Sequence, residues 1–168
     1  MKSRQEALVL LEEWVQDPGL RRHCLSVEAA MRAYARKRGE NEDWWGLTGL
    51  LHDFDYERYP NPPDHPLMGS KVLREKGYPE EVIYAILSHA DYLDNYPRIH
   101  PMDLALYACD ELAGLITATA ILRPNGIQDL TVTGVRKKMK SKGFARNVSR
   151  EDIKRGARDF GVDLDSHI

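Results

Sequence analysis

The sequence predicts an all-α protein built as a single helical domain. Apolar residues recur at helical spacing through most of its 168 residues, and the pattern breaks at Pro, Gly or helix-capping residues. No stretch shows the alternation of apolar and polar residues that a half-buried strand needs; residues 92–99 come nearest, but Asp, Asn and Pro interrupt them. A chain of this length fits one domain with its own core, so we expect one helical bundle over residues 1–168.

Six helices are predicted in the first three quarters of the chain. Ser3 and Glu6 form a capping box that opens the first, which ends before Pro18. The second runs from about residue 20 to 38 and ends at Gly39. Its inward face is predicted to carry three residues: Leu25, Ala29 and Ala33. The other four helices are expected at about residues 42–53, 66–77, 79–89 and 101–122, with Asp64 or His65 capping the fourth.

Beyond Arg123 the chain becomes basic. Thr131 or Thr133 is expected to open a short helix, and Ser149 to open the last one, which Gly161 closes. We therefore expect a core over about residues 20–121 and a basic helical segment over about 127–161. Residues 162–168 have the pattern of a further element that is cut short.

Composition narrows the possible partners. The formal net charge is −2, so no global field favours a nucleic acid polymer or a membrane surface, and neither is expected as a partner. The two cysteines provide no disulfide framework, and the polar N-terminus does not resemble a secretory signal. These features predict a cytoplasmic protein.

A histidine and an aspartate at the end of an apolar helix are the first indication of function. His52 and Asp53 directly follow Leu50 and Leu51, where further apolar residues would be expected. Other imidazoles and one carboxylate lie in or beside predicted helices: His23, His65, His89 and Asp110. Such a set is typical of a site for a divalent transition metal, namely Fe, Mn, Co, Ni or Zn.

Helix geometry limits how these side chains share an ion. Neighbours on a helix point about 100° apart, so His52 and Asp53 reach one ion only at a helix end, or Asp53 bridges two ions. The first ion is predicted to bind His23, His52, Asp53 and Asp110, and a second to bind His65 and His89 while sharing Asp53. Unpaired burial of Asp110 in an apolar helix would cost several kcal/mol, so it needs either a metal or a basic partner. Whether one or two ions bind stays open.

The order of these residues resembles the HD-domain superfamily of metal-dependent phosphohydrolases, an all-helical family named after the His-Asp pair. The likeness covers about residues 20–121, and the stretch from His65 to Gly69 is similar to the His-x-x-x-Gly motif of binuclear members. Residues 52–56, His-Asp-Phe-Asp-Tyr, are similar to a small group of predicted HD hydrolases. Many relatives instead have His-Asp-Ile-Gly followed by a lysine. Because Asp55 and Tyr56 stand there in this chain, no role for that lysine can be carried over.

The resemblance implies a phosphomonoesterase or phosphodiesterase that acts on a small phosphorylated substrate, such as a nucleotide, through metal-activated water. Asp53 and Asp91 are the catalytic candidates, the latter as a base or as a partner of a ligand. Asp55 and Tyr56 either orient a water or leaving group, or only cap the helix. The basic run supplies three substrate-binding candidates, unless it is a solvated helix face: Lys138, Lys142 and Arg146.

Two other classes of function stay open. The same fold and ligands, by resemblance, also support diiron oxygenases. A non-catalytic module that binds a nucleotide in the same pocket is the second alternative, although such a module has less need of a complete ligand set.

Overall fold

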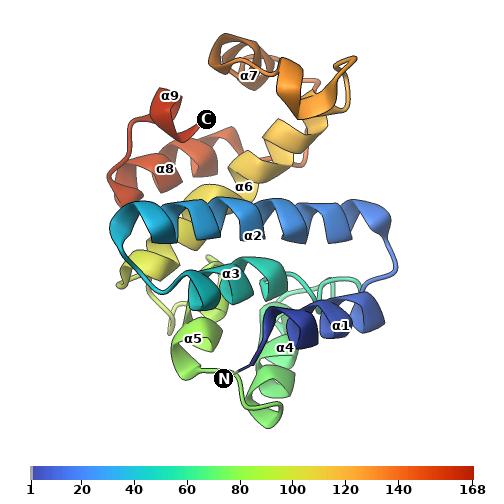
Figure 1. Ribbon diagram of the computed structural model, residues 1–168, viewed down its shortest axis with the longest axis vertical. Coiled ribbons are helices and arrows are strands. Elements are labelled where there is room, and N and C mark those ends of the chain that lie inside the picture. The colour runs from blue at the N-terminus through green and yellow to red at the C-terminus, as the bar shows by residue number, and fades with distance from the viewer. Residues whose placement is uncertain (1) are drawn as a thin grey trace. The chain divides into compact units, whose positions relative to one another are not determined.

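The all-α prediction is confirmed. In the computed structural model, which describes residues 2–168, every regular element is a helix (Figure 1). The chain divides into two compact units, one ending at Leu106 and the other beginning at Tyr107. Helix α6 (Pro101–Ala120) runs from the first into the second. The organisation as one domain over residues 1–168 stays a prediction. Within the described residues, no helix is long and apolar enough to span a membrane.

The first two helices begin where capping residues place them. The expected capping box of Ser3 and Glu6 opens α1 (Arg4–Trp14). Helix α2 (Pro18–Arg38) starts two residues earlier than predicted, because the Asp17 carboxylate caps it and Pro18 fits the first turn. Gly39 ends this helix with a φ of 71°, a left-handed conformation that glycine adopts without strain.

The predicted inward face of α2 is wrong. Leu25 is 39% exposed and Ala29 and Ala33 are also exposed, whereas the buried stripe is Cys24, Val27, Glu28, Met31 and Ala35. The reason is the close approach of the next helix. A Cβ added to Gly49 would lie 2.8 Å from the backbone nitrogen of Glu28, so the backbones touch on the Val27 side of α2.

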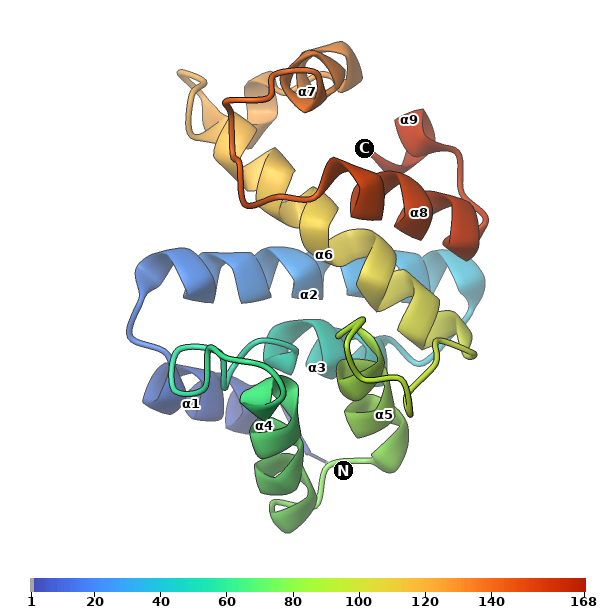
Figure 2. The same cartoon turned by 180° about the vertical axis from the view of Figure 1, so that it is seen from behind.

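Helix α3 (Glu42–Leu51) is the core of the first unit, and residues 45–51 are all buried. It packs against α2 and also against α1 and α5 (Glu80–Ser88), as Figure 2 shows. The helix ends at Leu51, two residues earlier than the predicted residue 53, and His52 is its C-cap. A polar side chain at this end is therefore held inside a packed interior.

Helix α4 (Asp64–Glu75) packs against α5. The prediction that Asp64 or His65 caps α4 is wrong, since Pro63 holds the cap position without a side-chain hydrogen bond. His65 has an extended ψ of 134° because the following proline, Pro66, disfavours helical geometry in the residue before it. The buried His65 side chain therefore leaves the chain from a kink rather than from a regular helical turn.

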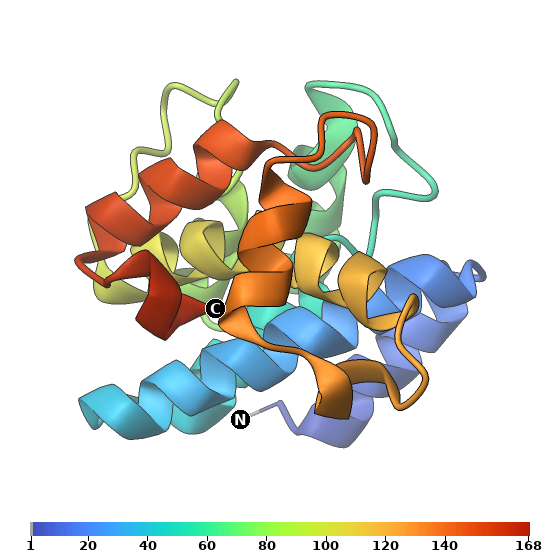
Figure 3. The same ribbon diagram turned by 90° about the horizontal axis from the view of Figure 1, so that it is seen from above.

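The second unit holds the rest of α6, a 3-10 turn η1 (Gly126–Asp129) and three helices: α7 (Val132–Met139), α8 (Arg150–Phe160) and α9 (Leu164–His167) (Figure 3). Its core is formed by Leu112, Leu115, Val135 and Ile153. Of the two threonines proposed as caps, Thr131 caps α7. Ser149 and Gly161 bound α8 as expected, and α9 is the short element that follows.

Candidate metal centre

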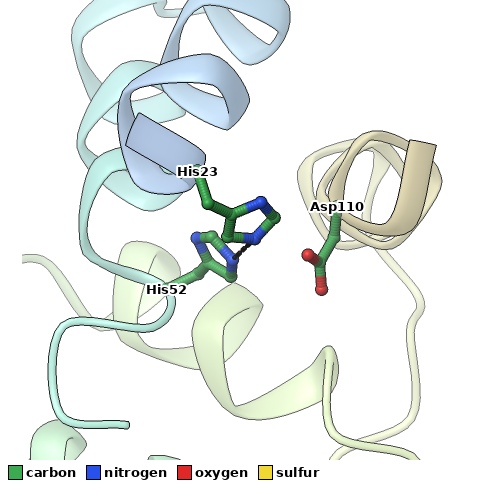
Figure 4. A group of neighbouring side chains, drawn as sticks. All are labelled: His23, His52 and Asp110. Carbon is green, nitrogen blue, oxygen red and sulfur yellow. Dashed lines mark hydrogen bonds between the residues drawn. The ribbon is translucent and has the colours of Figure 1, made fainter. Parts of the chain in front are cut away.

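His52 is held in a single orientation at the end of α3. The residue is fully buried, and its Nδ1 donates to the carbonyl oxygen of Gly49 at 2.8 Å. A carbonyl only accepts hydrogen bonds, so the Nδ1 atom carries the proton and the Nε2 atom of the neutral ring keeps its lone pair. Nε2 of His52 lies 3.1 Å from Nε2 of His23 on α2, and the two rings point toward each other (Figure 4).

Asp53 stands between two pairs of imidazoles. Its Oδ2 lies 3.5 Å from Nε2 of His52 and 3.8 Å from Nε2 of His23. Its Oδ1 lies 3.3 Å from Nε2 of His65 and 3.5 Å from Nε2 of His89. Each carboxylate oxygen therefore faces one histidine pair, which is the arrangement that a bridging carboxylate requires.

The second pair mirrors the first. The Nε2 atoms of His65 and His89 lie 3.3 Å apart. Nδ1 of His89 donates to the carbonyl oxygen of Ile86, and Nδ1 of His65 donates to Oδ1 of Asp55 at 2.7 Å. These outer hydrogen bonds direct the Nε2 atom of each ring toward Asp53, as metal-ligating histidines commonly require.

The donor set fits a divalent transition metal. In neutral rings whose Nδ1 atoms carry the proton, Nε2 lone pairs would face one another at 3.3 Å and face a carboxylate at 3.3–3.5 Å. Lone pairs at such distances repel unless a proton or a cation lies between them. Imidazole nitrogen with carboxylate oxygen is the donor combination of zinc, iron, manganese, cobalt and nickel sites.

Electrostatics shows how strongly the cluster attracts positive charge. Burial opposes protonation of His65, but hydrogen bonds from its ring to Asp53 and Asp55 raise its pKa to about 9. Burial alone would raise the pKa of Asp53, but the charge that His52 carries when protonated and hydrogen bonds from His65 and His89 hold it well below its usual range. The carboxylate is therefore ionised, and protons compete with any metal for the same nitrogens.

Asp110 belongs to α6, in the part of the helix that lies in the second unit; it is also drawn in Figure 4. Its role as the fourth ligand of the first ion stays a prediction from the sequence pattern.

The remaining candidates lie in different places. Asp91, 43% exposed at its side chain, pairs with Arg98 at 2.8 Å, and its catalytic role stays a prediction. Lys138 lines a hollow of about 520 Å³, whereas Lys142 and Arg146 line another of about 630 Å³. The three basic side chains thus border two hollows rather than one, and their binding role also stays a prediction.

Two features of the site were missed from the sequence. A hollow of about 420 Å³ lies beside His23 and is lined by Asp17, Gly19, Leu20, His23, Tyr56, Glu57 and Pro60. The other feature is the contact of Asp55 with His65: the sequence offered Asp55 only as a group that orients a water or leaving group or as a helix cap, whereas its side chain is fully buried against His65. A charged residue where many relatives have glycine was the available signal.

Comparison with known proteins agrees with this geometry. The helical fold gathers four imidazoles around one Asp, and such groups of side chains could hold a metal ion. The family model for the HD domain matches residues 20–115, more than half of the chain, so the protein belongs to the HD domain family. That family consists mostly of metal-dependent hydrolases. A search among curated proteins found no match.

Proposed function

We propose that the protein is a metal-dependent phosphohydrolase that acts on a small phosphate ester or nucleotide. The observation that carries the proposal is the position of Asp53, whose two oxygens face two separate pairs of imidazole nitrogens at 3.3–3.8 Å. Membership of the HD domain family supports it. The two buried free cysteines, Cys24 and Cys109, agree with a cytoplasmic location.

In this proposal His23, His52 and Asp53 hold the first ion together with Asp110, and His65 and His89 hold the second with Asp53. Divalent transition metals, when bound, lower the pKa of a coordinated water and neutralise charge on phosphoryl oxygens. The outer acceptors bind the Nδ1–H of His52, His65 and His89, so that in its neutral form each ring presents the Nε2 lone pair to the site. Asp53 supplies the negative charge that offsets the ions.

The hollow beside His23 is the proposed seat of the substrate's leaving group. Of the four histidines only His23 lines it, but its lining residue Tyr56 packs edge-on against the His65 ring, with ring centres 5.2 Å apart. The lining residues that the structure describes include two carboxylates and neither Lys nor Arg. Carboxylates accept hydrogen bonds from hydroxyls and repel phosphates, which favours a monoester whose leaving group is a sugar or a nucleoside over a nucleoside triphosphate.

Metal-free protein, prepared with a chelator, should be reloaded in separate samples with manganese, cobalt, iron, nickel or zinc. We expect phosphate release from p-nitrophenyl phosphate with at least one metal, and preference for nucleoside monophosphates over triphosphates. Failure of every metal to support release would refute the proposal. Oxygen consumption by the iron form would favour an oxygenase, and tight nucleotide binding without turnover would favour a binding module.

A further inference from the structure

Asp55 is buried in the turn that directly follows the His-Asp pair. Its Oδ1 accepts a hydrogen bond from Nδ1 of His65 at 2.7 Å, and its Oδ2 accepts one from the backbone nitrogen of Gly69, also at 2.7 Å. The side chain is 1% exposed. A carboxylate removed from water in this way is costly unless it is hydrogen-bonded, so both bonds are needed to keep it there.

The close approach of Asp55 to the backbone at position 69 requires a glycine there. A Cβ added at Gly69 would lie 2.6 Å from Cγ and Oδ2 of Asp55, closer than real side chains approach. His65 and Gly69 are the two ends of the His-x-x-x-Gly stretch, and both donate to the same carboxylate. The four-residue spacing of this stretch therefore places two hydrogen-bond donors around the Asp55 carboxylate, and one of them is the His65 ring.

We propose that Asp55 is a positioning residue that fixes His65 as a ligand of the second ion by accepting the proton on its Nδ1. The proposal rests on the binuclear site proposed above. His52 and His89 are oriented by backbone carbonyls, which no side-chain substitution removes. His65 alone of the three is oriented by a side chain, and that side chain carries a charge.

The consequence for the ring follows from the chemistry of the acceptor. A carboxylate cannot donate, so with Asp55 in place the single proton of the neutral ring, the form that a metal needs, stays on Nδ1, and the Nε2 lone pair faces Asp53. In Asp55→Asn, the amide can turn its NH₂ group toward His65, and the ring then gains stability by moving its proton to Nε2. A ring protonated at Nε2 cannot bind the second ion through that atom.

The test compares Asp55→Asn with Asp64→Asn, which makes the same change in charge one residue from His65 at an exposed position. Zinc stoichiometry and affinity should be measured by elemental analysis and calorimetry. We expect Asp55→Asn to weaken the second zinc about 10- to 100-fold, the range for loss of an outer hydrogen bond to a ligand, while the first zinc is retained. Asp64→Asn should bind both ions like the unmodified protein.

A second readout does not depend on metal. The proton on Nδ1 of His65, bonded to a carboxylate, should give a downfield proton resonance in the metal-free protein, and this signal should move upfield or vanish in Asp55→Asn. Gly69→Ala, which keeps the carboxylate but displaces it, should reproduce both effects. If Asp55→Asn does not fold, as judged by circular dichroism, Gly69→Ala decides the question.

The outcomes separate the two proposals. Unchanged second-ion affinity and an unchanged His65 signal in folded Asp55→Asn or Gly69→Ala would overturn the role of Asp55. Equal loss of both ions in a folded variant would overturn it as well, because Asp55 would then not act through His65. If the unmodified protein binds no transition metal but the His65 signal still responds to Asp55→Asn, the proposed function fails while the positioning of His65 by Asp55 stands.

Discussion

The two histidine pairs on either side of Asp53 are built by different means. The His23–His52 pair lies between packed helices, and His52 is oriented by a carbonyl of the buried helix α3. The His65–His89 pair lies where a helix kink and a helix end meet, and His65 is oriented by the carboxylate of Asp55. The His23 side chain is 20% exposed and lines a hollow, whereas those of His65 and His89 are 7% and 8% exposed.

The difference between a carbonyl and a carboxylate as the orienting group indicates separate roles for the two histidine pairs. A carbonyl orients a ring without adding charge, so the first pair depends on helix packing. A carboxylate also makes the ring more basic, so we expect the second pair to bind cations more strongly, in competition with protons. We infer that the first pair faces the substrate and that the second mainly holds charge.

The largest expected effect is that of the residue common to both pairs. Asp53→Ala removes the carboxylate that faces all four Nε2 atoms, so both ions should be lost together. Phosphate release should fall by more than about 100-fold, beyond the effect of losing an outer hydrogen bond. Elemental analysis and a phosphate assay measure the two effects. Retention of one full equivalent of metal would mean that Asp53 is not the bridge.

Substitution within one pair should affect one ion. We expect His65→Ala to bind a single equivalent of metal with the affinity of the first ion, and His23→Ala to retain the second ion but lose substrate turnover. Calorimetric titration of metal-free protein measures both. If either substitution abolishes both ions in a folded protein, the pairs form one site, and the comparison between them fails.

Binding at the second pair should depend on pH more steeply than binding at the first. The pKa of His65 is raised from 6.5 to about 9, so its protonated ring stabilises the metal-free fold below pH 6.5, and this contribution is lost as the pH rises through about 9. The metal needs the neutral ring, so its affinity should rise over the same window and its binding should release a proton.

Calorimetry in buffers of different ionisation enthalpy counts these protons. The unmodified protein should release more protons at pH 7.5 than His65→Ala, which lacks the raised group. Equal proton release by the two proteins would contradict the inferred electrostatic difference between the two histidine pairs.

The sequence was sufficient for the fold class and for the residues that form the cluster. Helix limits followed from caps such as Ser3, Gly39, Ser149 and Gly161, because local hydrogen bonding and backbone geometry determine them. The inward face of α2 did not follow, because the close approach of Gly49 decides it, and a periodic pattern holds no information about which neighbour packs on a helix.

The chemistry of the residue types made the histidine and aspartate cluster predictable from the sequence, whereas the contacts that orient its members were not predictable. Burial of an imidazole or a carboxylate costs free energy unless the group is hydrogen-bonded, paired with a charge or bound to a metal. His52 and Asp53 at the end of an apolar helix could therefore be recognised as functional candidates without the fold. The bond between Asp55 and His65 joins residues ten apart, at the two sides of the connection from α3 to α4, and only the folded chain brings them together. Hollows such as the one beside His23 are likewise properties of the packed chain.

The smallest expected effect tests whether packing alone positions the first pair. In Gly49→Ala the new Cβ would lie 2.8–2.9 Å from the backbone of Val27 and Glu28, so α3 must move away from α2. Overpacking of this kind costs about 1–3 kcal/mol of unfolding free energy. Because the Gly49 carbonyl orients His52, the first ion should weaken by about tenfold, and the second should not change.

Gly114→Ala is the matched control, since a Cβ there meets only Val148 at an ordinary 3.5 Å and a helical alanine gains about 1 kcal/mol over glycine. Thermal unfolding and zinc titration of both variants give the answer. If Gly49→Ala weakens binding of the second ion as much as binding of the first, the two histidine pairs are not positioned independently. The Asp53 carboxylate, which faces both pairs, would then couple them.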